Sequence, residues 1–436
     1  MKKTFLRELN LFDASLLIVG CIIGAGIFRT PASIAVHLQS PFLVLLVWTV
    51  GGFISLCGAF CYAELASVFP RTGGDYIYLS EAYGGLVGFL FGWTKLFIER
   101  TGTIAVLAFV FAEYLRFIFH YSEDTLKGVA CGAVLVLTLA NIAGIGFGKH
   151  IQNFFTMVKV AVILGIVGFG IGRAATVPSS LHPFFPERIT LDTVQSFGVA
   201  LIFVLWAYGG WSEAAYVAEE VKDSERNVPR AILLGLSLTM VLYLMINFVY
   251  LYYIPSETMA QEKLVAAATV TKAIGPGWGG GVSLLVSLSA FGALNGYILT
   301  GARILYALGE DHPLFRRFSK LHPKLHTPVV ALWFNAAVAM ILILTKSFEE
   351  ILTYTTVAIW VFFGMTGLSV FILRKKYPER KRPYVMWGYP IVPLLFIVTT
   401  VFFVLNACLK EASQSLFGLG IVFLGFPLYF ISRRLR

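Results

Sequence analysis

The amino-acid sequence predicts an all-α integral membrane protein with twelve transmembrane helices, two of them discontinuous. Apolar residues make up 58% of the 436 residues, charged residues 13%, and the mean hydropathy is +0.79. Stretches of roughly 20 apolar residues, enough to cross the hydrocarbon core, recur between polar turns. Two of them are interrupted by glycine-rich segments, Gly24-Ala25-Gly26-Ile27-Phe28 and Ala207-Tyr208-Gly209-Gly210-Trp211. A break within the membrane frees backbone groups that lipid cannot satisfy, so we expect each to line an enclosed cavity.

The twelve expected spans follow one another along the chain with short connections. The first is not a cleavable signal peptide, because Arg29-Thr30-Pro31 follows its glycines without a small-residue cleavage pattern. The longest connections, near 173–194 and 255–281, are too short for a soluble domain, so we expect one transmembrane domain over 1–436. The spans lie near residues 13–36, 43–68, 86–117, 127–144, 152–172, 195–218, 231–254, 282–307, 328–345, 350–373, 388–409 and 415–432.

Basic residues concentrate in alternate loops, which predicts a multi-pass protein of the cell (inner) membrane with both termini in the cytoplasm. The net charge of +10 reflects this bias and not a nucleic-acid surface, since no soluble basic face is present. The cytoplasmic set is Lys2, Lys3, Arg7, Arg71, Lys149, Lys222, Arg226, Arg230, Arg316, Arg317, Lys320, Lys324, Arg374, Lys375, Lys376, Arg380, Lys381, Arg382, Arg433, Arg434 and Arg436. The opposite loops hold only Arg116, Lys127, Arg173, Arg188, Lys263, Lys272, Lys346 and Lys410.

Enzyme and channel functions find no support in the residue pattern. The cysteines lie inside apolar spans without metal-ligand spacing, so we expect no metal and no cofactor. The histidines fall at loops or span ends, and neither a catalytic constellation nor a tandem pore loop is evident. We therefore expect a transporter and not an enzyme. The cysteines are Cys21, Cys57, Cys61, Cys131 and Cys408.

The two breaks occupy equivalent places, in spans one and six, which indicates two inverted repeats of five spans followed by two further spans. We expect the repeats at about 8–180 and 190–375 and the trailing helices at about 385–432. The half-helices at each break offer N–H dipoles on one side and C=O dipoles on the other, which suits a zwitterionic amino acid. The alternative is that these glycines only let neighbouring helices pack closely.

Several motifs resemble the amino acid/polyamine/organocation superfamily of transporters. They are Glu8-Leu9-Asn10 leading into Ile22-Ile23-Gly24-Ala25-Gly26-Ile27-Phe28, and Phe69-Pro70-Arg71-Thr72-Gly73-Gly74-Asp75-Tyr76. The second break, running into Val217-Ala218-Glu219-Glu220-Val221-Lys222, is similar to the L-type amino acid transporter branch and its bacterial serine/threonine exchanger relatives. Phe291-Gly292-Ala293-Leu294-Asn295-Gly296 also resembles that branch. The resemblance implies a LeuT-like inverted repeat and sodium-independent uptake or exchange of amino acids.

The resemblance also implies roles for residues at the breaks. The substrate carboxylate would lie on the first break, at Ile22, Gly24, Ala25 and Gly26. The substrate ammonium would meet carbonyls of the second, around Trp206, Ala207 and Gly209. Trp206 would cover the site, and Trp211 would help to close it as a gate.

Lys159 is a charge expected near mid-membrane. The fifth span begins near Lys149, so at about 1.5 Å per residue Lys159 lies on the order of 15 Å into a ~30 Å core. An ammonium at that depth needs carbonyl or carboxylate partners. In the resembling family a lysine here stands where sodium-coupled relatives hold their cation, which implies a coupling role. The alternative is a lysine that only braces spans one, five and eight.

Four further charges fall inside expected spans, and two interpretations of them remain open. Lys95 and Glu99 have i,i+4 spacing on the third span, next to Arg100, and are typical of a structural pair. Glu213 either lies free near the substrate side chain or faces these cations. A free Glu213 would favour cationic substrates, and a neutralised one favours small or apolar neutral ones. Glu64 and the Glu219-Glu220 pair fall near cytoplasmic helix ends. They are candidate partners of Arg71 or Arg230 in an inner gate, and the alternative is that they only lie on solvated faces.

We therefore expect a sodium-independent secondary transporter of amino acids that works by alternating access, a neutral L-amino acid permease or exchanger. The alternative is a polyamine or cationic amino acid transporter. Eukaryotic relatives bind a heavy subunit through a cysteine between spans three and four, and the segment from Arg116 to Lys127 contains none. We expect no disulfide-linked heavy subunit, only the amino acid substrate and the lipid bilayer as partners.

Overall fold

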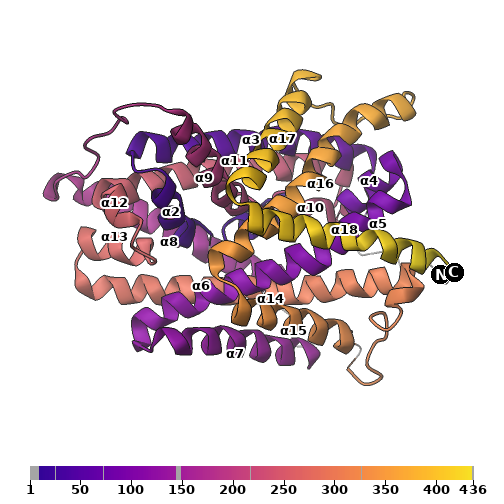
Figure 1. Ribbon diagram of the computed structural model, residues 1–436, viewed down its shortest axis with the longest axis horizontal. Coiled ribbons are helices and arrows are strands. Elements are labelled where there is room, and N and C mark those ends of the chain that lie inside the picture. The colour runs from indigo at the N-terminus through magenta and orange to yellow at the C-terminus, as the bar shows by residue number, and fades with distance from the viewer. Residues whose placement is uncertain are drawn as a thin grey trace.

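The computed structural model describes residues 9–24, 26–71, 73–143, 149–216, 218–325 and 327–434, and this part of the chain is helical (Figure 1). Its one β-type contact is an isolated bridge between Leu9 and Val221. Asn10 caps the first helix, because its side chain accepts from the Asp13 N–H while the Asp13 carboxylate accepts from the Asn10 N–H. The first expected span therefore begins at a well-defined N-terminus.

The first half of the chain contains both a discontinuous helix and a π-helical turn. Its elements are α1 (Leu11–Ile22), α2 (Gly26–His37), α3 (Pro41–Val68), α4 (Asp75–Tyr83), α5 (Gly85–Thr94), the π-helix η1 (Lys95–Arg100), α6 (Thr101–Phe119), α7 (Glu123–Ile142), α8 (Lys149–Arg173) and the 3-10 turn η2 (Ala174–Thr176).

The second half begins with another discontinuous helix. Its elements are α9 (Leu191–Ala207), α10 (Glu213–Tyr216), the 3-10 turn η3 (Ala218–Glu220), α11 (Ser224–Tyr253), α12 (Ser256–Met259), α13 (Val265–Ala273), α14 (Pro276–Asp311), the 3-10 turn η4 (Pro313–Phe315), α15 (Val329–Thr345), α16 (Phe348–Lys376), α17 (Ile391–Lys410) and α18 (Ala412–Arg434).

The structure has ten helical segments long and apolar enough to cross a membrane, counted over the described residues. Two shorter apolar helices, α9 and α15, coincide with the sixth and ninth expected spans. Both breaks are confirmed: α1 ends at Ile22 before α2 begins at Gly26, and α9 ends at Ala207 before α10 begins at Glu213. Ala25 lies outside the described residues.

Two features differ from the sequence expectation. The connection near 255–281 contains the helices α12 and α13, which pack on α2 and α14, because an apolar segment such as Val265–Ala273 gains by burying one face. The third span is not one regular helix, since η1 interrupts it between α5 and α6. A π-turn is rare inside an α-helix and frequently occurs at functional sites.

The discontinuous helices lie within the bundle and contact each other. In Figure 1, α2, α12 and α13 lie towards one end of the long axis and α4 towards the other. Helix α2 packs on α9, and α1 packs on both α8 and α11. Helix α16 packs on both α6 and α9, and α6 packs on α14. Because α2 contacts α9 and α1 contacts α10, the two breaks share one neighbourhood.

Candidate functional site

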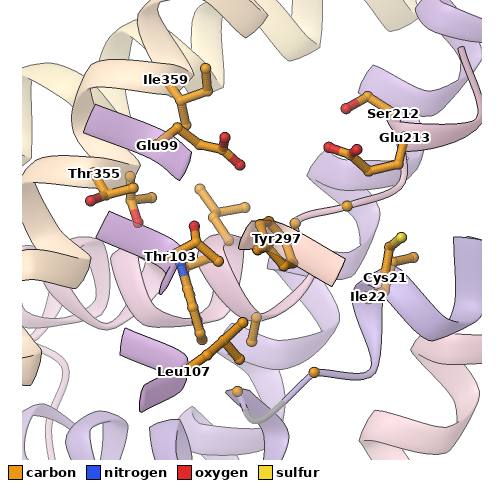
Figure 2. Close-up of a pocket in the computed structure, with 18 of the residues that line it drawn as sticks. Cys21, Ile22, Glu99, Thr103, Leu107, Ser212, Glu213, Tyr297, Thr355 and Ile359 are labelled. Atoms are coloured by element: carbon orange, nitrogen blue, oxygen red, sulfur yellow. The ribbon is translucent and has the colours of Figure 1, made fainter. Parts of the chain in front are cut away.

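A cavity lies at the two helix breaks (Figure 2). Its wall comes from the break between α1 and α2, the break between α9 and α10, and the helices η1, α6, α14 and α16. Its volume of about 60 Å³ is room for a few water molecules or small polar groups, since a cavity needs about 10–15 Å³ to hold one water molecule. In Figure 2, Glu99, Thr103 and Thr355 lie on the opposite side of the view from Cys21, Ile22 and Glu213.

The first break presents the N-terminus of α2 to this cavity, where the first N–H groups of a helix have no intrahelical acceptor. Ile22, Gly24 and Gly26 all line the cavity. A Cβ on Gly26 would lie 2.9 Å from the Trp206 ring and 3.3 Å from Ala207, so glycine lets the two discontinuous helices touch. The position of Gly24 is open, with Leu107 nearest at 3.9 Å. Close packing thus explains Gly26 but not Gly24.

The second break presents the C-terminal end of α9, which carries the negative end of the helix dipole. Trp206, Ala207 and Gly209 line the cavity. Gly210 has φ of +105°, and a Cβ there would lie 2.9 Å from the Cys21 backbone carbon, so glycine is required for both conformation and contact. The two breaks therefore set opposite helix dipole ends around one space.

Tyr243 on α11 joins the two breaks, a residue that the sequence analysis missed. Its hydroxyl lies 2.8 Å from the carbonyl oxygen of Ile22 and 3.3 Å from that of Ala207. The side chain is fully buried. A tyrosine within an apolar span is only a weak signal, because aromatic residues are common in helix cores. The Tyr243 hydroxyl satisfies carbonyl groups that the breaks leave without helical donors.

Lys159 lies buried in α8 and donates to the carbonyl oxygen of Gly20 on α1 at 3.2 Å. The expected contact between this lysine and the discontinuous first helix is therefore present. Gly20 lies in the last turn of α1, where carbonyl groups carry partial negative charge. No group of three or more His, Cys, Asp or Glu side chains in the described ranges could hold a metal ion.

Glu213 is neutralised by the cations of the third span, and the two open interpretations are thereby resolved in favour of pairing. Arg100 donates from Nη2 to both carboxylate oxygens of Glu213, at 2.9 and 3.0 Å, and Lys95 Nζ lies 3.3 Å from the same carboxylate. Glu99 lies 3.4 Å from Lys95 Nζ and 3.4 Å from Arg100 Nε. Lys95, Glu99 and Glu213 line the cavity. We call Lys95, Glu99, Arg100 and Glu213 the charge quartet.

The two tryptophans predicted to close the site occupy different environments. Trp206 lines the cavity and packs edge-on against Phe348, with ring centroids 6.5 Å apart. Trp211 is fully buried beside the second break, against Tyr62 and Phe363, with ring centroids 4.7 and 5.4 Å away. Trp206 can therefore touch a ligand directly, and Trp211 meets it only through Phe363, which also lines the cavity.

An ion-pair cluster that the sequence analysis missed closes the end of the molecule near α12. Arg29 on α2 lies 2.8 Å from Glu113 on α6 and 2.8 Å from Glu349 on α16, and its guanidinium stacks 4.6 Å from the centroid of Phe348. Charged residues inside the expected spans 13–36 and 86–117 were the available signal. This cluster ties the first discontinuous helix to two helices of the surrounding wall.

At the other end, the partners of Glu64 differ from those expected. Glu64 pairs with Arg374 at 2.6 Å and lies 3.6 Å from Arg382, and not with Arg71 or Arg230, because α16 packs against α3 there. Leu9 donates to Glu220 O at 3.0 Å and Lys222 N donates to Leu9 O at 2.8 Å. The segment before α1 is thus bound to the segment after α10.

Asp75, at the start of α4, forms a third set of contacts at this end. Its carboxylate accepts hydrogen bonds from Tyr62, from Tyr216 at 2.7 Å and from Thr366 at 2.9 Å. Burial raises the pKa of Asp75 to about 6, although the hydrogen bonds from Tyr216 and Thr366 partly oppose the rise. Tyr216 belongs to α10, so Asp75 joins the second discontinuous helix to α3 and α16.

Comparison with known proteins points to one family. The family model described as "Amino acid permease" matches residues 9–426. The serine/threonine exchanger SteT of Bacillus subtilis (strain 168) is 32% identical over 97% of this chain and 96% of its own length. The b(0,+)-type amino acid transporter 1 of Mus musculus is 31% identical over 98% of this chain and 88% of its own. The large neutral amino acids transporter small subunit 2 of Homo sapiens is 30% identical over 98% and 80%.

Proposed function

The chain belongs to the amino acid permease family and is an amino acid permease or exchanger, and we propose that it carries neutral L-amino acids by sodium-independent alternating access. We further propose that it has twelve transmembrane spans in the cell membrane, with both termini cytoplasmic. The spans would form inverted repeats at about 8–180 and 190–375, followed by two helices at about 385–432. The succession of helices and the two breaks five spans apart support this arrangement.

The observation that carries the proposal is the pair of opposite helix ends facing one cavity. The substrate carboxylate would accept from the backbone at the first break, around Ile22, Gly24, Ala25 and Gly26. The substrate ammonium would donate to carbonyl groups of the second break, around Trp206, Ala207 and Gly209. A zwitterion satisfies both ends at once, whereas a simple anion or cation satisfies only one.

Lys159 would supply the fixed cation that makes sodium unnecessary. Its ammonium already lies 3.2 Å from the Gly20 carbonyl oxygen, on the helix that ends at the first break. A tethered ammonium there can balance the carbonyl dipoles of α1 without a soluble ion. This position supports a coupling role for Lys159.

The pairing of Glu213 argues against the polyamine or cationic amino acid alternative. A cationic side chain gains little from a carboxylate that Arg100 and Lys95 already neutralise at 2.9 and 3.3 Å. The cavity therefore favours neutral side chains, with Glu213 acting through its ion pairs and not as a free anion.

Alternating access would use the contacts at the two ends of the molecule. Opening one end requires separation of Arg29 from Glu113 and Glu349, and opening the other requires release of Leu9 from Glu220 and of Asp75 from Tyr216. Trp206 and Trp211 would move with α9 and α10 as the site closes. We propose that the protein works without a disulfide-linked heavy subunit.

Uptake into proteoliposomes tests this function. Purified protein is reconstituted with or without internal amino acid, and uptake of radiolabelled serine, threonine, leucine, lysine, glutamate and putrescine is measured with Na⁺ and with K⁺. We expect neutral amino acids to enter equally in both salts and faster when amino acid is present inside. Uptake that requires Na⁺, or uptake of putrescine alone, would contradict the proposal.

A further inference from the structure

Lys95 occupies a cation site built from other residues of the cavity wall. Its ammonium lies 3.3 Å from Glu213, 3.4 Å from Glu99 and 5.1 Å from the centroid of the Tyr216 ring. Two carboxylates and an aromatic face are groups that bind ammonium ions. The Lys95 side chain is buried, and Lys95, Glu99 and Glu213 all line the cavity. The same three groups would suit the ammonium of a ligand if Lys95 were absent.

The π-turn brings these groups together. In a regular α-helix of 3.6 residues per turn, residues five apart do not share a face. The wider turn of η1 lets Lys95 and Arg100, five residues apart, both reach Glu213, at 3.3 and 2.9 Å. Glu99 lies 3.4 Å from each of these two cations. The quartet thus forms at one place in the wall, with its two positive and two negative charges mutually paired.

Charge balance in a buried site controls which ligands can enter. An unpaired buried charge is costly, and a site whose charges are all paired has no net charge to offer a ligand. A substrate with a lysine-like side chain would have to bring its side-chain ammonium into a quartet that already holds two cations. Removal of Lys95 would leave Glu99 and Glu213 with only Arg100, and so a net negative charge beside the cavity.

We propose that Lys95 is a built-in occupant of an ammonium site and excludes amino acids with cationic side chains from this transporter. The inference rests on the proposed transport of neutral amino acids through the cavity. It assigns to Glu99, Glu213 and Tyr216 a latent site for the side-chain ammonium of lysine or ornithine. The neighbouring fixed charges are Arg100, which stays paired with Glu213, and Asp75, which Tyr216 contacts from the far side.

The test is the change of substrate class on Lys95→Met, which keeps most of the side chain and removes only its terminal ammonium. We expect lysine uptake into proteoliposomes to rise at least about tenfold relative to serine uptake, because the substrate ammonium replaces the missing one. Lys95→Arg, which retains the charge, should keep lysine excluded. Lys95→Met combined with Glu99→Gln restores charge balance and should lose the gained lysine uptake.

Two results would overturn the inference. One is a Lys95→Met protein that still carries serine but gains no lysine uptake, and the other is a double variant that keeps lysine uptake. If Lys95→Met does not fold, Glu99→Gln provides the reverse test, since Lys95 would then offer an excess positive charge. That variant should gain glutamate uptake and still exclude lysine, and unchanged selectivity would contradict the proposal.

The wild-type protein separates this inference from the proposed function. Absence of neutral amino acid uptake by the wild type would refute the function itself. Wild-type uptake of lysine as fast as that of serine would leave the transporter function standing and refute only the role of Lys95.

Discussion

Single residues in this protein carry charge into places where lipid and protein exclude water. Lys159 is buried and donates a hydrogen bond to the carbonyl oxygen of Gly20. A buried ammonium is tolerated when carbonyl groups or carboxylates compensate for lost hydration. Because the ammonium of Lys159 binds a carbonyl of α1, a movement of α1 changes the environment of this charge, and loss of the charge changes the environment of α1.

We expect Lys159→Met to abolish sodium-independent uptake, because the carbonyl end of α1 loses its fixed cation. Lys159→Arg keeps the charge and should retain part of the activity. The measurement is serine uptake in K⁺ medium by equal amounts of protein that elutes as a single species. A wild-type rate for Lys159→Met would refute the tethered-cation role and leave the lysine as a structural brace.

The buried carboxyl of Asp75 makes the stability of the folded protein depend on pH. Its pKa is raised to about 6 by burial, so folding favours the protonated carboxyl. Stability from this group is complete below the ordinary pKa of about 3.8 and is lost as the pH rises through about 6.

We therefore expect Asp75→Asn to flatten the change in thermal stability between pH 5 and pH 7. The wild type should lose more stability over this interval than the variant. Thermal unfolding of the detergent-purified proteins, followed by intrinsic fluorescence, provides the measurement. Asp124→Asn, at an exposed carboxyl, is the control and should leave the wild-type slope unchanged. Equal slopes for Asp75→Asn and wild type would rule out this titration.

At the scale of elements, the discontinuous helices depend on glycine where they touch each other. Gly26 on α2 faces the Trp206 ring of α9, and a Cβ would lie 2.9 Å from that ring. Gly24, two residues away, has nothing closer than 3.9 Å. The same break thus contains one position set by helix packing and one that faces open space.

We expect Gly26→Ala to lower the melting temperature, because overpacking of a tight contact costs about 1–3 kcal/mol. Gly26→Val should in addition abolish substrate binding. Gly24→Ala is the matched control for stability and should melt near the wild-type temperature. If the two alanine variants melt alike, the contact between α2 and α9 does not require glycine.

Considered as a whole molecule, the bundle holds its central cavity between contacts at both ends. The Arg29 cluster joins α2, α6 and α16, while Glu64, Leu9 and Asp75 hold elements together at the other end. Both sets of contacts are present in the structure. Transport requires one set to open while the other stays formed.

Cys21 lines the cavity, so its reaction with a thiol reagent reports the opening of one end of the molecule. In a variant with the other four cysteines replaced by alanine, we expect a membrane-impermeant thiol reagent to label Cys21 slowly in intact cells. Substrate should protect it. In the proposed orientation, with both termini cytoplasmic, the Arg29 cluster lies on the outer side. Arg29→Gln leaves Glu113 and Glu349 without their cation, so it should open this end and speed labelling several-fold. A separate variant that retains only Cys131 is the control. Unchanged labelling of Cys21 would show that Arg29 does not close this end.

The membrane class, the approximate positions of the helices and the two breaks could be predicted from the sequence alone. Composition and the length of apolar runs specify these features because the bilayer imposes them locally. The contact of Lys159 with α1 was also predictable, since a mid-span charge must find a partner in a nearby helix. For Glu213 the sequence left two interpretations open, a free carboxylate near the substrate side chain or one that faces the cations of the third span.

Contacts between residues far apart in the chain became known only from the packing of the helices. Arg29 and Glu349 are 320 residues apart in the chain, and Arg100 and Glu213 are 113 apart. The hydrogen bonds of Tyr243 to both breaks likewise depend on packing. So does the choice of Arg374, and not Arg71 or Arg230, as the partner of Glu64. The π-turn at Lys95–Arg100 has no local sequence signature that we recognised. Such features arise because pairing depends on how helices approach one another, which periodicity along a single helix does not encode.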